Sequence, residues 1–296
     1  MRPTYAYSVY GLVLRVPFPC PSLQFAPDES MPDVTVAEGP VPAELADRTA
    51  AGLAWEAAPC RFLSHAGRRT GRFLVEAGCR VTLDRSPAAT DARVALHFLT
   101  TIMAAVMRQR GMLVLHANAV LTQAGAVVFS GASGSGKSST LAALLRLGHR
   151  MLADDMTAIR MDEGGVATVV PGIAQFNLPG EAATSLNQST DGMAQRRGRR
   201  VKITIPAAVA AAPAPLRALY LLQPEAGTTC VRREPVTGAA KFALLQASLY
   251  GPVHQADRQA FFPLEVALLS KTPVYRLVRP LDRWTMDDVL RVMLQD

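Results

Sequence analysis

The segment FSGASGSGKSST, residues 129–140, spaces its glycines, lysine and hydroxyl groups as a phosphate-binding loop does. Gly131 is followed by four residues and then by Gly136, Lys137 and Ser138. A glycine-rich backbone ahead of a helix can turn its N–H groups toward a β-phosphate, while the lysine neutralises phosphate oxygens and the hydroxyl ligates Mg²⁺. The predicted nucleotide contacts are Gly131, Ser133, Gly134, Ser135, Gly136, Lys137, Ser138 and Ser139.

Two carboxylates follow this loop in the chain, at a spacing that would place them near it in the folded protein. Asp154 and Asp155 end the strand-like segment HRMLADD. In a right-handed strand–helix–strand unit both strands end at one edge of the sheet, so these carboxylates should face the bound phosphates and Mg²⁺. Neighbouring residues of a strand point to opposite sides, so one aspartate can hold the metal while the other reaches an attacking hydroxyl. The alternative is an ordinary acidic turn.

A histidine lies on the strand pattern before the loop strand. His116 stands in LVLHANAV, among apolar residues. Taken alone, such a histidine is most often a core residue bonded to backbone, and its place ahead of the phosphate loop makes it a third candidate for the site.

Regular elements are predicted around these residues. Residues 112–130 read as two strands joined by a turn at 122–125. The loop follows, then a helix ended by Gly148, then the short strand that leads to the aspartates. A strand, loop, helix and strand of this length match the size of a βαβ unit.

The first part of the chain has a different pattern. Residues 1–88 alternate apolar and polar side chains between Gly, Pro and Asp, which is typical of antiparallel strands. Residues 91–110 carry apolar residues at helical spacing, and Gly111 ends that pattern. We therefore predict a small β-rich N-terminal domain over 1–88 and an α/β domain with a mixed sheet over 89–296.

A polar segment, residues 181–200, lacks an apolar period and is predicted to be a loop of the kind that is often functional. Its end, QRRGRRVK, concentrates positive charge. A solvated loop and a binding site for an acidic peptide or for phosphates both remain open. Nucleic acid is not expected as a partner, because no aromatic residues are interleaved for stacking. The tentative substrate contacts are Arg196, Arg197, Arg199, Arg200 and Lys202.

Composition narrows the class of protein. The chain has 296 residues and a net charge of +7, and 49% of it is hydrophobic, so a sizeable core is expected. It carries no apolar run of about 18 residues, which argues against a membrane span and favours a cytoplasmic protein. The four cysteines form no CxxC pair and are interpreted as structural thiols.

Together, LHANAV, GASGSGKSS and GHRMLADD resemble the catalytic domain of HPr kinase/phosphorylase and its relatives. That family has a histidine on the strand before the loop, a Walker A loop, and paired aspartates after a short helix that ends at glycine. The match covers residues 112–160. The resemblance implies a P-loop kinase domain, related to phosphoenolpyruvate carboxykinase, that uses ATP and Mg²⁺ to phosphorylate a serine of a protein.

Carried over by position, the resemblance gives each residue a role. Asp154 would be the general base that takes the seryl proton, and His116 would tune or orient it. Asp155 and Ser138 would serve the metal, and Lys137 the phosphates. Because phosphoryl transfer depends mostly on positioning and charge neutralisation, these groups would suffice. HPr enzymes are hexameric, so a homo-oligomer is a further expectation, with no residues of this chain assigned to it.

The resemblance also bears on the substrate. VVPGIAQFNLPG lacks the acidic, glycine-rich segment of the HPr enzymes, and residues 1–88 differ from their N-terminal domain. The chain resembles more closely the divergent HPr-kinase-like proteins encoded beside peptide-biosynthesis genes, including lasso-peptide tailoring kinases. This implies a serine of a small protein or ribosomal precursor peptide as substrate.

Three functions fit these observations. The first is an Mg-ATP-dependent serine kinase for a small protein or peptide. The second is a regulatory or scaffolding protein that binds ATP without phosphoryl transfer, which would need a metal-holding aspartate but no second carboxylate. The third is a small-molecule kinase, which would need a closed substrate pocket, whereas residues 181–200 indicate an open one.

Overall fold

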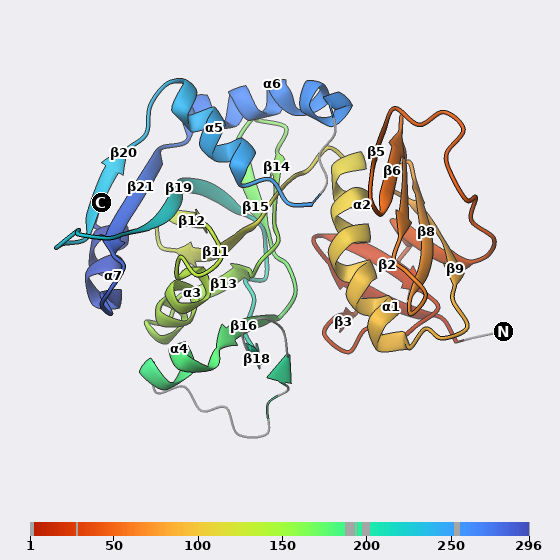
Figure 1. Ribbon diagram of the computed structural model, residues 1–296, viewed down its shortest axis with the longest axis horizontal. Helices are drawn as coiled ribbons and strands as arrows, with labels where there is room; N and C mark the ends of the chain where they lie inside the picture. Colours follow the sequence, from red (N-terminus) through yellow and green to blue (C-terminus); the bar gives the residue numbers. More distant parts are fainter. Residues whose placement is uncertain are drawn as a thin grey trace. The chain divides into compact units, whose positions relative to one another are not determined.

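A computed structural model describes residues 3–27, 29–186, 193, 195–196, 202–251 and 255–295 (Figure 1). Two compact units are formed, one by residues 1–114 with 250–262 and the other by 115–249 with 263–296. This division differs from the boundary at residues 88/89 that the sequence suggested, because the helical segment 91–109 belongs with the first unit.

The first unit is built on a mixed sheet with the order β3-β1-β2-β4-β9-β8-β7-β6-β5. Its strands are β1 (Tyr5–Val9), β2 (Leu12–Val16), β3 (Gln24–Phe25), β4 (Val34–Glu38), β5 (Ala50–Gly52), β6 (Trp55–Ala58), β7 (Arg61–His65), β8 (Gly71–Glu76) and β9 (Arg80–Arg85). Most neighbours run antiparallel, and β4 lies parallel to both β2 and β9. Buried and half-buried residues alternate along β8, which agrees with the alternation seen in the sequence.

The helix predicted over residues 91–110 is confirmed. It consists of α1 (Asp91–His97), a π-helical turn (Phe98–Ile102) and α2 (Met103–Gln109). The ring of Phe98 packs edge-on against Phe18 at 5.5 Å between centroids, and His97 Nε2 lies 2.9 Å from Ser64 Oγ. These contacts bury the apolar face of the helix against the sheet of the first unit.

The second unit contains a sheet with both parallel and antiparallel strand pairs. Its strands are β11 (Ala117–Thr122), β12 (Gly125–Ser130), β13 (Arg150–Ala153), β14 (Thr157–Met161), β15 (Ala167–Val170), β19 (Ala214–Glu225), β20 (Arg232–Pro235) and β21 (Val274–Pro280), with β10 (Leu113–Leu115) at the boundary of the units. The order runs β14-β15-β19-β12-β11-β13, and β21 lies beside β19 with β20 at its side. β12, β19 and β21 run parallel, whereas β11 is antiparallel to β12 and to β13.

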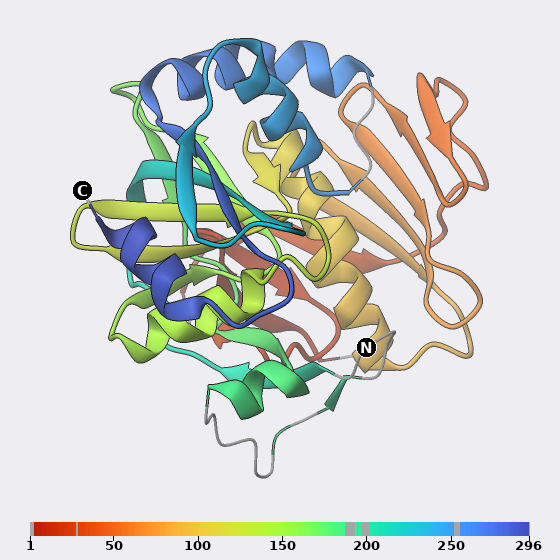
Figure 2. The ribbon, with the colours of Figure 1, turned by 60° about the vertical axis from the view of Figure 1, so that its left-hand side comes forward.

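The strand–helix–strand unit around the loop takes a particular form. α3 (Lys137–Arg146) connects β12 to β13, and both strands are antiparallel to β11, which lies between them. β12 and β13 therefore point the same way and end at the same edge of the sheet, as predicted, although they are not neighbours. The apolar face of α3 packs on β11 and β13, and α7 (Met286–Leu294) lies beside it (Figure 2).

A small separate sheet has the order β16-β18-β17. Its elements are β16 (Gln175–Pro179), β17 (Gln195–Arg196) and β18 (Lys202–Pro206). The start of the polar segment 181–200, predicted to be a loop, forms α4 (Gly180–Ser185), because Ala182 and Ala183 bury one side of it. β16 and α3 are in contact, so this sheet is attached to the loop helix.

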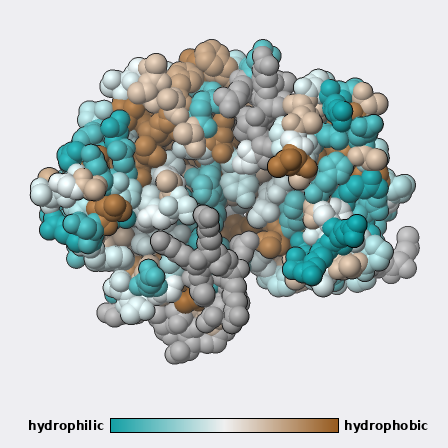
Figure 3. All heavy atoms as spheres, viewed as in Figure 1, coloured by the Kyte–Doolittle hydropathy of each residue, from teal (hydrophilic) through white to brown (hydrophobic). Residues whose placement is uncertain are grey.

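The remaining helices are α5 (Ala239–Ala247) and α6 (Gln255–Lys271). The view in Figure 3 shows a largely hydrophilic face with apolar side chains gathered at the upper left, over α5. The exposed face of α5 carries Ala239, Ala240, Ala243 and Ala247. Among the described residues, no helix combines the length and apolar character needed to cross a membrane.

Candidate active site

The loop between β12 and α3 depends on glycine at defined positions. Gly131 has φ 152° and Gly136 has φ 105°, values that residues with a Cβ rarely adopt. A Cβ at Gly131 would lie 2.5 Å from Ser135 Oγ and 2.7 Å from the carbonyl oxygen of Leu222. The loop therefore fits against β19 only if residue 131 lacks a side chain.

Lys137 lies folded over this loop. Its side chain is buried, and Nζ donates a hydrogen bond of 2.6 Å to the carbonyl oxygen of Gly131. Burial lowers the pKa of Lys137, and the negative charge of Asp155 partly opposes that effect. The ammonium group is thus held at the mouth of the loop, where an anion would relieve the cost of burying it. Ser135 Oγ, also buried in the loop, has no hydrogen-bond partner among the described residues.

An arginine braces the loop from a distant strand. Arg279, at the end of β21, donates to the carbonyl oxygen of Ser135 from Nε at 3.3 Å and from Nη2 at 3.0 Å. Its guanidinium also approaches the Cβ position of Gly136, at 3.3 Å from Nη2. These bonds hold the Ser135 carbonyl toward β21.

The carboxylate of Asp154 is enclosed by amide donors. Oδ1 accepts a bond of 2.8 Å from Asn118 Nδ2, and Oδ2 accepts one of 2.9 Å from the backbone N–H of Asn177. Burial, reinforced by repulsion from Asp155, raises the pKa of Asp154 to about 7, although the bonds from Asn177 oppose the rise. The whole residue keeps some exposed surface, so the burial concerns the carboxylate itself. Asp154 therefore changes protonation near neutral pH.

Asp155 is oriented by its backbone. Its φ of 60° lies in the left-handed region, which breaks the strand alternation after β13. Its N–H donates to Asn118 Oδ1 at 3.0 Å, so Asn118 holds both aspartates at once. The Asp155 carboxylate lies 3.9 Å from Lys202 Nζ on β18, in a half-exposed pair.

The hydrogen bond made by His116 defines its tautomer. His116 Nδ1 lies 3.1 Å from the backbone carbonyl oxygen of Asp155. A carbonyl oxygen can only accept, so Nδ1 carries the hydrogen. Although the residue as a whole is exposed, partial desolvation of the ring and the nearby charge of Lys137 lower the pKa of His116, which favours the neutral ring. In a neutral ring with hydrogen on Nδ1, the lone pair is on Nε2, and His116 can accept a proton there.

A cavity of about 450 Å³ brings most of the predicted residues together. Its walls are formed by His116, Ala132, Ser133, Gly134, Gly136, Lys137, Ser138, Ser139, Asp155, Pro179, Glu181, Ala182, Ser185, Lys202 and Trp284. Gly131, Ser135 and Asp154 are not part of this wall, although each is next in the chain to a residue that is. Ser138 and Asp155, the predicted Mg²⁺ ligands, both line the wall, and Glu181 is a further carboxylate there. No cluster of three potential metal-ligating side chains occurs among the described residues.

The basic segment is described only in part. Arg197, Arg199 and Arg200 lie outside the described residues, and Arg196 contributes its backbone to β17. Lys202 is the member of the set whose side chain is described, and it lines the cavity. The tentative substrate contacts of the arginines stay predictions.

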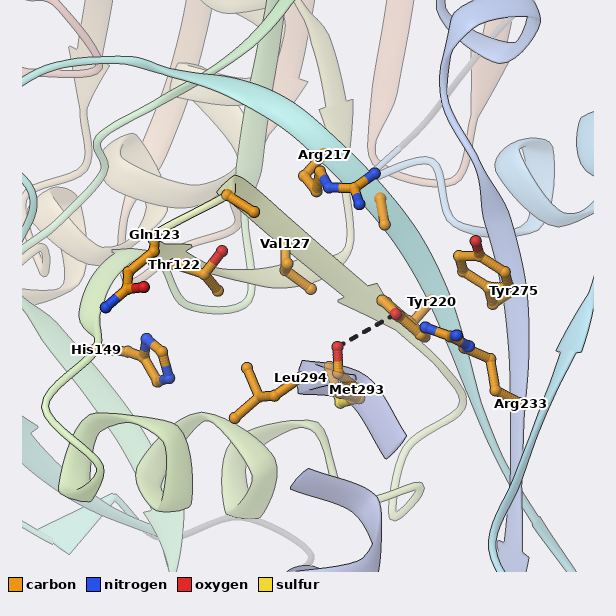
Figure 4. Close-up of a pocket in the computed structure, with 12 residues that line it drawn as sticks. Thr122, Gln123, Val127, His149, Arg217, Tyr220, Arg233, Tyr275, Met293 and Leu294 are labelled. Carbon is orange, nitrogen blue, oxygen red and sulfur yellow. Dashed lines mark hydrogen bonds between the residues drawn. The ribbon is translucent and has the colours of Figure 1, made fainter. Parts of the chain in front are cut away.

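A second cavity, of about 330 Å³, lies at the other end of β12 (Figure 4). Tyr220 in its wall donates to the carbonyl oxygen of Met293 at 3.4 Å, and the ring of Tyr220 stacks on Tyr275 with centroids 5.2 Å apart. Arg233 lies over the Tyr275 ring, 4.8 Å from its centroid. None of the residues predicted to contact phosphate or metal lines this cavity, so the candidate active site is the first one.

Comparisons with known proteins give little further help. No family model matches the chain, and no curated protein matches it. Among solved structures, the chain is similar to the Hpr(Ser) kinase/phosphatase from Coxiella burnetii, with 15% sequence identity over 61% of this chain and 92% of that one. The TM-score is 0.31, and at that value the likeness carries no argument.

Several site residues were not predicted from the sequence. Asn118 stands two positions after His116, and the two-residue period of a strand could have placed both on one face. Asn177, Arg279 and Trp284 lie far along the chain from the loop, and no motif marks them. Glu181 lines the cavity at the start of α4, and no pattern in the sequence assigned it a role.

Proposed function

We propose that the chain is an Mg-ATP-dependent kinase that transfers the γ-phosphate to a serine hydroxyl of a small protein or peptide. The observation that carries the proposal is the convergence of the phosphate-loop residues, His116 and Asp155 on one cavity of about 450 Å³. Each of these groups meets a distinct need of phosphoryl transfer, namely phosphate binding, metal binding and proton removal.

The loop residues fit a nucleoside triphosphate with Mg²⁺. Lys137 is a buried cation whose Nζ donates to a backbone carbonyl, and the buried hydroxyl of Ser135 has no partner among the described residues. Bound phosphates would satisfy polar groups of this kind. Ser138 and Asp155 would hold Mg²⁺, which typically takes one or two carboxylates together with substrate phosphates. When bound, ATP supplies the phosphoryl group and Mg²⁺ offsets the negative charge of the phosphates.

Two residues can be considered for proton removal from the serine. Asp154 has a pKa of about 7, which suits a base at neutral pH, but its oxygens accept bonds from Asn118 and Asn177. His116 lines the cavity and presents a basic Nε2. We therefore assign proton removal to His116 and give Asp154 a positioning role. The assignment of Asp154 as base, made from the sequence, remains the competing prediction.

The peptide substrate is the most specific part of the proposal. It is supported by the resemblance of the sequence to peptide-tailoring kinases and by Lys202, a cation at the cavity wall beside the basic segment. A ribosomal precursor peptide with a serine next to acidic residues would suit these charges.

The alternative function, ATP binding without phosphoryl transfer, draws on one observation. Both oxygens of the Asp154 carboxylate accept hydrogen bonds from amide donors. This carboxylate could therefore serve the fold alone, which is all that a protein that binds ATP without transferring phosphate would need of it.

The test uses purified full-length protein, Mg-ATP and a panel of serine-containing peptides that includes precursor peptides encoded nearby. We expect peptide-dependent ADP release and a mass increase of one phosphate on serine, both lost in Lys137→Met. A protein that binds ATP but shows neither activity with any peptide would support the alternative. Phosphate found on a small molecule would place the chain among the small-molecule kinases.

A further inference from the structure

Trp284 is an aromatic residue in the wall of the candidate active site. It lies between β21 and α7, and 50% of its surface is exposed. A single exposed apolar side chain needs no explanation by itself. This one is different because Lys137 and Ser138 line the same cavity, so the indole borders the space that the predicted phosphate-binding residues also border.

The position of Trp284 is fixed by the elements on either side. Before it, Arg279 ties the end of β21 to the phosphate loop through the Ser135 carbonyl. After it, α7 packs against α3 through buried residues such as Val289 and Leu290. Both anchors belong to the framework that also holds the loop. The indole is thus kept at the cavity by the fold, while half of its own surface stays uncovered.

We propose that Trp284 is the residue against which the nucleobase of the bound nucleotide stacks. This inference rests on the proposed function, because it needs a nucleotide in the phosphate loop. An indole ring offers little to phosphate oxygens, which the loop N–H groups and Lys137 can bind. Its π-face suits a planar base, and stacking on an aromatic side chain tolerates any base while favouring the larger purine surface.

The proposal separates two parts of nucleotide affinity. Lys137 acts on the phosphates, so Lys137→Met should weaken ATP and inorganic tripolyphosphate alike. Trp284 acts on the base, so Trp284→Ala should weaken ATP about 5- to 150-fold, equivalent to about 1–3 kcal/mol, and leave tripolyphosphate binding unchanged. Trp284→Phe keeps an aromatic face and should lie between the wild type and Trp284→Ala.

The chain offers a matched control. Leu281 lies three residues before Trp284 in the same connection, is 58% exposed, and is absent from the cavity wall. Leu281→Ala should leave the affinities for ATP and tripolyphosphate as in the wild type. Circular dichroism and thermal melting of each variant establish that it is folded.

A spectroscopic measurement tests the contact directly. The sequence has two tryptophans, Trp55 and Trp284, so Trp55→Phe leaves Trp284 as the single indole reporter. In that background ATP with Mg²⁺ should quench the fluorescence of Trp284, whereas tripolyphosphate with Mg²⁺ should change it little. Both titrations are run with the intact chain.

The outcomes keep the two proposals apart. If the wild type binds neither ATP nor tripolyphosphate, the proposed function fails and this inference fails with it. If the wild type binds both ligands, and Trp284→Ala lowers the affinities for ATP and tripolyphosphate equally or not at all, the base-stacking role is overturned while the proposed function stands. Unchanged ATP affinity with a raised KM for peptide would overturn it as well, because Trp284 would then contact the peptide substrate.

Discussion

Asp154→Asn is the most informative perturbation of this site. Asp154 has a pKa raised to about 7, mainly by burial, whereas the group titrates near 3.8 in the unfolded chain. Between these values the folded protein keeps a proton that the unfolded chain has lost. The stability that this proton supplies is complete below about pH 4 and is lost as the pH rises through about 7. An asparagine side chain does not titrate, so the stability of the variant should lack this dependence on pH.

The magnitude follows from the pKa values. As the pH rises from about 5 to about 8, the wild type loses stability over the two pH units below the folded pKa of about 7. The free energy of unfolding therefore falls by about 2.7 kcal/mol. Because the residue keeps some exposure, this figure is an upper bound, and roughly 1.5–2.7 kcal/mol is the expected range. Asparagine also turns an NH₂ group toward the donor of Asn118 or of Asn177, at a pH-independent cost of about 1–3 kcal/mol.

The assay is urea unfolding of wild type and Asp154→Asn at several pH values over this window. The variant should be the less stable protein at about pH 5, and the gap should narrow or reverse by about pH 8. Asp282→Asn, an exposed carboxylate outside the cavity, controls for buffer effects. If the difference in free energy of unfolding between wild type and Asp154→Asn stays constant with pH within about 0.5 kcal/mol, position 154 does not hold a buried titrating carboxylate.

Three further predictions concern the site. Lys137→Met should retain the fold and lose ATP binding, measured by calorimetry, and unchanged affinity would remove the phosphate loop from the mechanism. His116→Gln should lower turnover by about 10²–10⁴ and abolish the fall in rate as the pH drops through the lowered pKa of His116. A wild-type pH–rate profile in that variant, with the acidic limb missing instead from Asp154→Asn, would make Asp154 the base. Arg279→Ala should raise the Kd for ATP about 10-fold by releasing the Ser135 carbonyl, whereas Arg276→Ala on the same strand should not, and equal effects would deny Arg279 its bracing role.

Local spacing was enough to predict the loop and the elements on either side of it. Glycines at 131 and 136, followed by a lysine and a hydroxyl, set a chain conformation within a few residues, and the strand and helix patterns around them depend on equally short periods. The helix at 91–109 followed from the same kind of regularity. The sequence also predicted that β13 would end at the edge of the sheet where the loop between β12 and α3 lies, because chain direction alone requires it.

Tertiary structure decided which groups meet at that edge. β11 lies between β12 and β13, an order that depends on packing of the whole sheet. The left-handed backbone of Asp155 overrides strand alternation, so its carboxylate faces the cavity while Asp154 is bound by Asn118 and Asn177. Asn177 and Trp284 lie far from the loop in the chain, and only the folding of distant segments onto α3 places them beside it. The periodicity of residues within a short segment cannot predict such contacts, because their free energy comes from surfaces buried between segments far apart in the sequence.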